Sequence, residues 1–376
     1  MNKVSISQLN KHFENSTIEK FLNIKLDEEN NDILEDIQRK SVEQNGSAIK
    51  HIENPSEEIK KLAVELNICN IQFIENPSED VQKLAVQYDG NAIKYIKNPS
   101  EDVQKIAVKK NGSAIEYIEN PSEEIKKLAV ENNGYNIKII ENPSEDVQKL
   151  AVENGYAIQY IKNPSEDVQK IAVKNYGCAI QYIENPSEDV QKIAVQKNGC
   201  AIKYIENPSE NVQKLAVEDY GCAIQYIKNP SKEIQKIAVK QNGYAIKFIE
   251  NPSEEIQKLA VQEDGRAIQF IENPSEEIQK IAVEQNGNAI QYIENPSEEI
   301  QKLVVQKNGN DVGFIKNPSE NIIHIALKNI NALYTETKYK IAMDLYHLEE
   351  KKNEPQKSKN AEIIGQLIKL LQKLEV

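Results

Sequence analysis

Residues 99–120 read PSEDVQKIAVKKNGSAIEYIEN, and this pattern returns along most of the chain. Asn-Pro-Ser occurs thirteen times, and successive prolines lie 22 residues apart except for one step of 21. The prolines are Pro55, Pro77, Pro99, Pro121, Pro143, Pro164, Pro186, Pro208, Pro230, Pro252, Pro274, Pro296 and Pro318. Self-similarity at a short, fixed period is typical of solenoids, in which each unit packs only against its neighbours. The repeat therefore decides the architecture, although it names no ligand.

Each repeat carries the signals of a first helix. The Asn-Pro pair supplies an N-cap and a first helical residue, and Glu101 completes a capping arrangement with that asparagine. Val103, Ile106 and Ala107 follow at helical spacing and form an apolar stripe. Gly112 is expected to end the helix in the left-handed C-cap conformation, so this helix should span about a dozen residues.

A second, shorter segment follows the glycine. Ala114, Ile115 and Ile118 make its buried side, and the pattern fits either an α-helix or a single 3₁₀ turn. Neither segment can bury its apolar stripe alone, so stacking must supply the core. The sequence therefore predicts an all-α fold, an α-solenoid or superhelix of about 14 tandem 22-residue helix-turn-helix repeats with helical caps.

Both ends of the chain depart from the repeat. Residues 1–32 are predicted to form an N-terminal helical cap and residues 33–320 the tandem repeats. Residues 321–348 are expected to form a C-terminal helical cap, followed by a charged linker over 349–360. Apolar residues at helical spacing predict an amphipathic helix over 361–376. This helix either covers the open end of the solenoid or joins two copies of the chain as a homo-oligomer.

Composition excludes several classes of function. The formal net charge is −13, so a nucleic-acid-binding face would be a local exception to the overall field. The sequence has no long apolar run and no hydrophobic leader, so a cytoplasmic protein without membrane contact is expected. It also has no nucleophile elbow, no phosphate loop and no cluster of histidine with carboxylates. A protein that is not an enzyme is therefore predicted.

The four cysteines, Cys69, Cys178, Cys200 and Cys222, share one place in the repeat. Equivalent positions in adjacent repeats should lie roughly 9–10 Å apart. This is farther than the Cα separation of about 7 Å that a disulfide tolerates. The histidines are scattered, and neither Cys-x-x-Cys nor a comparable histidine pair occurs. Reduced thiols, no metal and no cofactor are therefore expected.

Two blocks carry a resemblance to known repeats: residues 251–261, NPSEEIQKLAV, and residues 242–246, NGYAI. They resemble the NPSEEVQ…AVKQNGYAI-type repeats of bacterial and phage proteins. Over about residues 33–320 the chain is also similar to the short helical-pair solenoids of bacteria, notably the leucine-rich repeat variant proteins, with HEAT repeats as longer relatives. The resemblance implies a helical solenoid and no particular activity, because repeat folds host many partners.

One position varies within the otherwise uniform repeat, the residue directly after the turn glycine. This variable ladder consists of Ser47, Cys69, Asn91, Ser113, Tyr135, Tyr156, Cys178, Cys200, Cys222, Tyr244, Arg266, Asn288 and Asn310. Repeat proteins commonly read partners through such a ladder. The predicted binding residues are its central members, Tyr135, Tyr156, Cys178, Cys200, Cys222, Tyr244 and Arg266. The alternative is a tolerant turn position that varies without a role.

A second regular feature is an aromatic side chain at the fifth residue after the glycine. This aromatic row consists of Phe73, Tyr95, Tyr117, Tyr160, Tyr182, Tyr204, Tyr226, Phe248, Phe270, Tyr292 and Phe314, interrupted by Ile139. Tyrosines spaced about 10 Å apart could stack bases or hold a peptide. Phenylalanine replaces tyrosine freely, however, which favours semi-buried packing of the ring over a role for the hydroxyl.

The sequence thus predicts a non-catalytic scaffold that holds a protein or peptide partner along one face. The alternative is a nucleic-acid-binding solenoid of bacterial or phage origin that uses Lys and Tyr ladders, or an acidic DNA mimic. The first helix alternates Glu or Asp with Gln and Lys, which dilutes the charge that mimicry needs. The charge of the variable face distinguishes the protein-binding scaffold from the nucleic-acid-binding solenoid, because phosphate binding needs a positive stripe.

Overall fold

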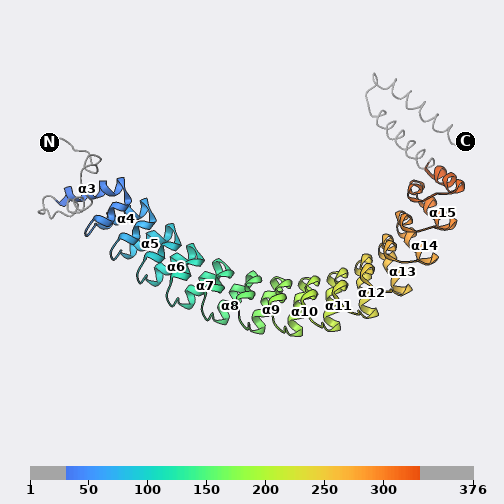
Figure 1. Cartoon of the computed structure of the whole chain (residues 1–376), viewed down its shortest axis with the longest axis horizontal. Coiled ribbons are helices and arrows are strands. Elements are labelled where there is room, and N and C mark those ends of the chain that lie inside the picture. The colour runs from blue at the N-terminus through green and yellow to red at the C-terminus, as the bar shows by residue number, and fades with distance from the viewer. Residues whose placement is uncertain (1–30, 331–376) are drawn as a thin grey trace, which may run out of the picture. The chain divides into compact units, whose positions relative to one another are not determined.

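The computed structural model describes residues 31–330, and the chain divides after Lys197 into two compact units. Within each unit, short α-helices alternate with 3₁₀-helices, and each helix pair contacts the pairs before and after it. The pairs follow one another in chain order (Figure 1). The predicted all-α solenoid of tandem repeats is thereby confirmed.

The repeat that begins at residue 33 has the same two-segment form as the later ones. The helices of the first unit are α3 (Asn31–Gln44), η2 (Gly46–His51), α4 (Glu57–Leu66), η3 (Ile68–Phe73), α5 (Glu79–Tyr88), η4 (Gly90–Tyr95), α6 (Glu101–Lys110), η5 (Gly112–Tyr117), α7 (Glu123–Asn132), η6 (Gly134–Ile139), α8 (Glu145–Ala151), η7 (Val152–Asn154), η8 (Tyr156–Tyr160), α9 (Glu166–Asn175), η9 (Gly177–Tyr182) and α10 (Glu188–Lys197).

The second unit continues the same alternation of long and short helices. Its helices are η10 (Gly199–Tyr204), α11 (Glu210–Asp219), η11 (Gly221–Tyr226), α12 (Lys232–Gln241), η12 (Gly243–Phe248), α13 (Glu254–Glu263), η13 (Gly265–Phe270), α14 (Glu276–Gln285), η14 (Gly287–Tyr292), α15 (Glu298–Lys307) and η15 (Gly309–Phe314), and residues 320–330 are helical as well.

The start of each α-helix differs from the sequence prediction. Ser100, rather than the asparagine before the proline, is the N-cap of α6, and its Oγ accepts from the Val103 amide at 3.4 Å. Asn98 instead has φ of +48°. Asparagine tolerates this left-handed conformation better than other L-residues. The helix therefore begins two residues after the proline and is 10 residues long, shorter than predicted.

The buried stripe is also narrower than predicted. Val103, Ala107 and Val108 have no exposed surface, whereas Ile106 is only partly buried. The same half-buried leucine or isoleucine recurs in the other repeats, including Ile171. At about 100° per residue, Val103 and Val108 flank Ala107 on the buried face, and Ile106 lies at the edge of that face.

The turn glycine has a different role from the one predicted. Gly155 is the only glycine with positive φ among the described residues, so the regular turns contain no left-handed glycine. A Cβ at Gly90 would lie 2.3 Å from the carbonyl oxygen of Ala107 in the next repeat. Glycine is thus required because neighbouring repeats approach closely, not because the turn needs its conformational freedom.

The second segment of each repeat is a 3₁₀-helix, which settles a choice that the sequence left open. In the 98–120 repeat it is η5, whose first turn is capped by Asn111: the side-chain oxygen accepts from the Ser113 amide at 3.1 Å. Ala114, Ile115 and Ile118 lie in the core, as predicted.

Some predictions fall outside the described residues. They are most of the N-terminal cap, the later part of the C-terminal cap, the linker over 349–360 and the amphipathic helix over 361–376 with its proposed homo-oligomer. Among the helices of residues 31–330, none has the length and apolar content needed to cross a bilayer.

Candidate partner-binding face

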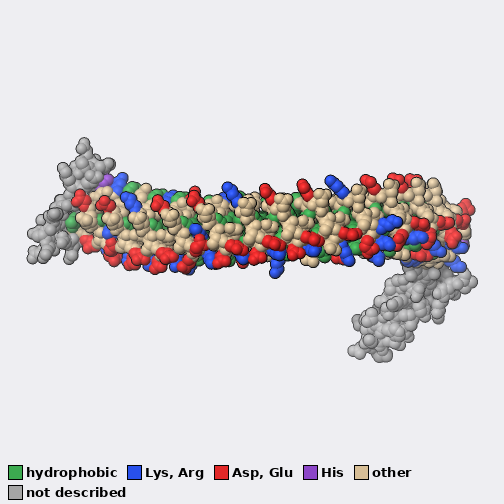
Figure 2. All heavy atoms as spheres, turned by 90° about the horizontal axis from the view of Figure 1, so that it is seen from below, with side chains coloured by type: hydrophobic (Ala, Val, Ile, Leu, Met, Phe, Trp, Pro, Cys, Tyr) green, Lys and Arg blue, Asp and Glu red, His purple; other side chains and the backbone are tan. Residues whose placement is uncertain are grey.

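The α-helical side of each repeat is an ionic edge that joins neighbours. Lys105 lies 2.7 Å from Glu124 of the next repeat and 3.8 Å from Glu101 of its own helix. In the second unit, Lys258 bridges Glu254 and Glu277 in the same way, at 3.4 and 2.9 Å. Figure 2 shows acidic side chains gathered along one edge with basic ones among them. Lysines on this edge therefore offset part of its acidic charge.

The N-cap serines extend this edge. The Oγ of Ser122 donates to Glu101 of the preceding repeat at 3.1 Å, and Ser100 donates to Glu79 at 3.1 Å. The hydrogen bond from Lys83, followed by that from Ser100, lowers the pKa of the Glu79 carboxyl. The hydrogen bond from each of these N-cap serines to a glutamate of the preceding repeat thus joins neighbouring repeats.

The 3₁₀ side of the repeats carries the variable ladder, and its predicted binding residues differ in exposure. Tyr135 and Arg266 are exposed, whereas Tyr156, Cys178, Cys200 and Tyr244 are partly buried. Cys222 is only 8% exposed, and burial raises the pKa of its thiol. A ladder that binds a partner is expected to be solvent-accessible along its length, and this expectation is wrong for Cys222.

Two ladder positions have a structural role. Ser47 donates to the buried Asn70 of the next repeat at 3.1 Å, and Ser113 donates to the buried Asn136 at 3.0 Å. Each asparagine also donates to a backbone carbonyl in the α-helix of its own repeat at 2.8 Å. A serine therefore appears on the ladder where the following repeat carries a buried asparagine, a correlation that could have been found in the sequence.

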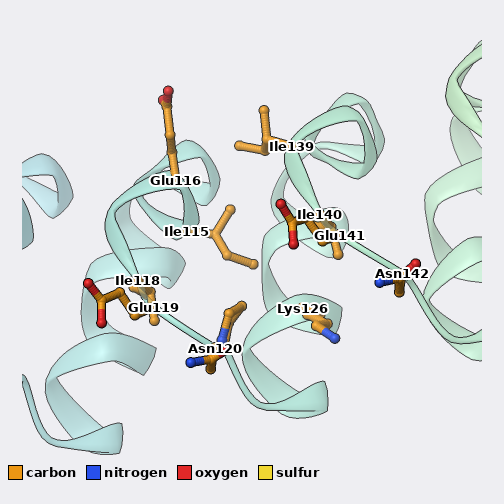
Figure 3. A pocket seen from close by; sticks show the side chains of 11 residues that line it. Ile115, Glu116, Ile118, Glu119, Asn120, Lys126, Ile139, Ile140, Glu141 and Asn142 are labelled. Atoms are coloured by element: carbon orange, nitrogen blue, oxygen red, sulfur yellow. The ribbon is translucent and has the colours of Figure 1, made fainter.

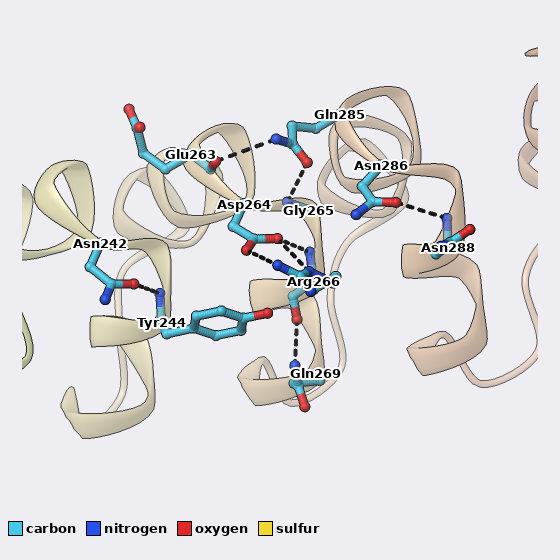
Figure 4. Close-up of polar contacts among 10 residues, drawn as sticks. All are labelled: Asn242, Tyr244, Glu263, Asp264, Gly265, Arg266, Gln269, Gln285, Asn286 and Asn288. Atoms are coloured by element: carbon cyan, nitrogen blue, oxygen red, sulfur yellow. Dashed lines mark hydrogen bonds and ion pairs between the residues drawn. The ribbon is translucent and has the colours of Figure 1, made fainter.

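A polar clamp links repeats next to the ladder (Figure 4). The side chain of Gln285 accepts from the Gly265 amide at 2.7 Å and donates to the Glu263 carbonyl at 3.3 Å. Arg266 pairs with Asp264 at 2.9 Å, which lowers the pKa of that carboxyl. A side chain that precedes the turn glycine of one repeat therefore hydrogen-bonds to the backbone of the preceding repeat. This contact limits which residues can occupy that position.

The aromatic row lies at the surface. Its most exposed members retain 36–44% of their accessible area, and they are Phe73, Tyr117, Tyr160, Tyr182, Tyr204, Tyr226, Phe248, Tyr292 and Phe314. Tyr95 and Phe270 are more buried. The rings thus pack on one side and meet solvent on the other, so the predicted semi-buried packing leaves a large aromatic surface accessible.

Ladder tyrosines contact the aromatic row of the following repeat. Tyr135 meets Tyr160 edge to face with ring centroids 5.9 Å apart, and Tyr156 meets Tyr182 at 6.3 Å. Tyr176 adds a further ring 5.2 Å from Tyr156. These residues form two groups of ring contacts in the first unit, one around Tyr135 and one around Tyr156. The ladder and the row, separate features of the sequence, are one surface in the structure.

Hollows open between successive 3₁₀-helices. One of about 620 Å³ lies between η5 and η6, with Ile115, Glu116 and Ile139 on its walls and Lys126 beside the Asn-Pro turn (Figure 3). A hollow of about 580 Å³ recurs in the second unit, where Tyr226 forms one wall. A depression of this kind therefore occurs between 3₁₀-helices in both units.

The described residues offer little else as a site. None of the four cysteines, all within the described residues, forms a disulfide. Residues 31–330 contain no group of three or more His, Cys, Asp or Glu side chains placed to hold a metal ion. Comparison with family models, curated proteins and solved structures finds no match to the chain. The 3₁₀ side, with its aromatic row, is the best candidate for a functional surface.

Proposed function

We propose that the chain is a non-catalytic scaffold that holds a protein or peptide along the 3₁₀ side of its repeats. The observation that carries this proposal is the aromatic row, one partly exposed ring in nearly every repeat, set beside regular hollows. Aromatic side chains with one accessible face are enriched at protein interfaces, where they supply large contact area at low entropic cost.

The charge beside the row supports a protein partner over a nucleic acid. The charged side chains beside the row are those four and seven residues after each turn glycine. In the second unit, four lysines balance four glutamates: Lys203, Lys228, Lys247 and Lys316, and Glu206, Glu250, Glu272 and Glu294. In the first unit the corresponding side chains are Lys50, Lys94, Lys97, Lys138 and Lys162 against Glu53, Glu75, Glu116, Glu119, Glu141 and Glu184. A near-neutral surface lacks the positive stripe that phosphate binding needs.

The ionic edge argues against an acidic mimic of DNA. A mimic must present uncompensated negative charge at regular intervals, whereas Lys105 and Lys258 each pair with two carboxylates and so offset half of the negative charge there. The edge is better explained as the joint that holds the repeats together.

A display experiment tests the scaffold. Random peptides displayed on phage are selected against the full chain, and the selected peptides are measured by fluorescence anisotropy. Joint replacement of Tyr135, Tyr156 and Tyr244 by serine should lower the affinity for the selected peptides by at least about tenfold, because it removes the rings that contact Tyr160, Tyr182 and Phe270 of the aromatic row edge to face.

The matched control is Tyr88→Ser, which removes an exposed tyrosine that belongs to neither the ladder nor the row. It should leave binding unchanged. Selection that yields no peptide, or peptides that bind the triple variant as tightly as the parent, would count against the scaffold. Tighter binding of a labelled oligothymidine than of any peptide would favour the nucleic-acid alternative.

A further inference from the structure

Of the two units, the second holds the longer unbroken run of the aromatic row. Its six members are Tyr204, Tyr226, Phe248, Phe270, Tyr292 and Phe314, one in each successive 3₁₀-helix from η10 to η15. All except Phe270 are more than one third exposed. The run is therefore a track of equivalent rings, and a ligand that follows it must itself repeat at the same interval.

The interval of the track matches one peptide conformation. Packed helices lie about 8–10 Å apart, which sets the step from ring to ring. A polyproline II helix has three residues per turn and advances about 9.3 Å per turn, so every third side chain faces the same side at that interval. An extended strand turns alternate side chains to opposite faces. An α-helix returns to the same face at every turn of about 5.4 Å, and two turns span about 10.8 Å, longer than the interval of the track.

The chemistry between the rings fits the same ligand. The hollow of about 580 Å³ between η10 and η11 has Ile205, Pro208 and Tyr226 among its walls, and Lys203 and Gln213 add polar groups. A proline ring can pack against the aromatic wall. Polyproline II has no internal hydrogen bonds, so its carbonyls are free to accept from donors on the surface.

Several rings of the track are held in place before any ligand arrives. The Lys247 ammonium lies 5.8 Å from the Phe248 ring and 5.6 Å from the Phe270 ring. Tyr244 meets Phe270 edge to face at 5.6 Å, and Arg266 lies over the Tyr244 ring at 5.7 Å. Rings fixed in this way lose little side-chain entropy on binding, which favours a ligand that is also stiff.

We propose that this track binds a proline-rich segment in the polyproline II conformation, one turn of the peptide per repeat. The proposal rests on the scaffold function and specifies its partner. Aromatic-lined surfaces suit such segments because the ligand is already ordered in solution.

The experiment measures binding of fluorescein-labelled oligoprolines of roughly six, twelve and eighteen residues to the full chain. Affinity should rise with each length, because each additional turn meets one more ring. The double variant Tyr226→Ser with Phe248→Ser should bind the longest oligoproline at least about tenfold more weakly. Tyr88→Ser should bind it as the parent does, and both variants should keep the parent's circular dichroism spectrum.

Two comparison peptides of the same length separate the outcomes. One is a Gly-Ser repeat, which is flexible, and the other is a helical Glu-Ala-Ala-Ala-Lys repeat. Equal binding of all three, or no gain of affinity with oligoproline length, would overturn the proposal. If the peptides selected by phage display bind and the oligoprolines do not, the proline-rich partner is wrong while the scaffold stands. If neither binds, both are wrong.

Discussion

The short repeat, from Asn142 to Asn163, is one residue shorter than the regular repeat from 98 to 120, and the structure changes where the α-helix meets the 3₁₀-helix. In the regular repeat, α6 runs for 10 residues and Asn111 caps η5. In the short repeat, α8 ends after 7 residues and continues as η7, and Gly155 opens η8 with φ of +57° and ψ of −66°.

The ionic edge is unaffected by this change. Lys149 of the short repeat lies 3.0 Å from Glu145 and 3.5 Å from Asp167 of the next repeat, and Ser165 donates to Glu145 at 3.0 Å. The α-helical side therefore carries the continuity between repeats. The 3₁₀ side tolerates a deletion because a glycine can replace an asparagine cap when its backbone enters a region closed to other residues.

The largest effect should come from Gly155→Ala. Its dihedral angles fall in the strained γ-turn region, and an added Cβ would lie 1.9 Å from the Tyr176 ring. We expect a loss of about 3 kcal/mol in the free energy of unfolding, measured with urea. Adding Tyr176→Ala should recover only part of this loss. Full recovery would show that ring contact, and not the backbone, fixes the glycine.

A regular turn should respond less strongly. Gly90→Ala places a Cβ against a backbone oxygen without straining φ, so a loss of about 2 kcal/mol is expected by the same measurement. Gly313→Ala is the matched control, because a Cβ there meets nothing within 4 Å. The control should be neutral or slightly stabilising. Equal effects of the two changes would contradict the close-approach role of the turn glycine.

Removal of the asparagine cap, which the short repeat lacks, should lower the free energy of unfolding by a smaller amount. Asn111→Ala removes the acceptor of the Ser113 amide, at a cost of about 1 kcal/mol. Tyr220 occupies the same position in η11 and makes no capping hydrogen bond. Tyr220→Asn should therefore raise the melting temperature by a few degrees. A lower melting temperature would show that the tyrosine ring itself stabilises its repeat.

The smallest effect is the acid response of the ionic edge, which should be alike in both kinds of repeat. Lys83 and Lys149, each assisted by a serine, lower the pKa of Glu79 and Glu145 below 4.5. Their stabilisation is present above the unfolded pKa and is lost as the pH falls through the folded one. The melting temperature should thus be steady from about pH 7 to 5 and decline below about 4.5. Glu79→Gln and Glu145→Gln should flatten this decline equally.

The candidate surface was only partly predictable from sequence. The row of aromatic residues and the ladder could be read directly, and Tyr135 and Arg266 are exposed as expected. The contact between Tyr135 and Tyr160 could not be read, because it joins residues of adjacent repeats whose spacing depends on packing. The burial of Cys222 has the same origin.

The sequence by itself determined the repeat, its period, the presence of two helical segments and most of the residues that fill the core. These follow from local periodicity and from the proline of each repeat, such as Pro99, which act within a single repeat. Only the tertiary structure decided that Ser100 caps the helix while Asn98 turns left-handed, and that Gly90 is needed for close approach. These features depend on where the neighbouring repeat lies. That position results from the packing of all side chains between two repeats and is not encoded in either one alone.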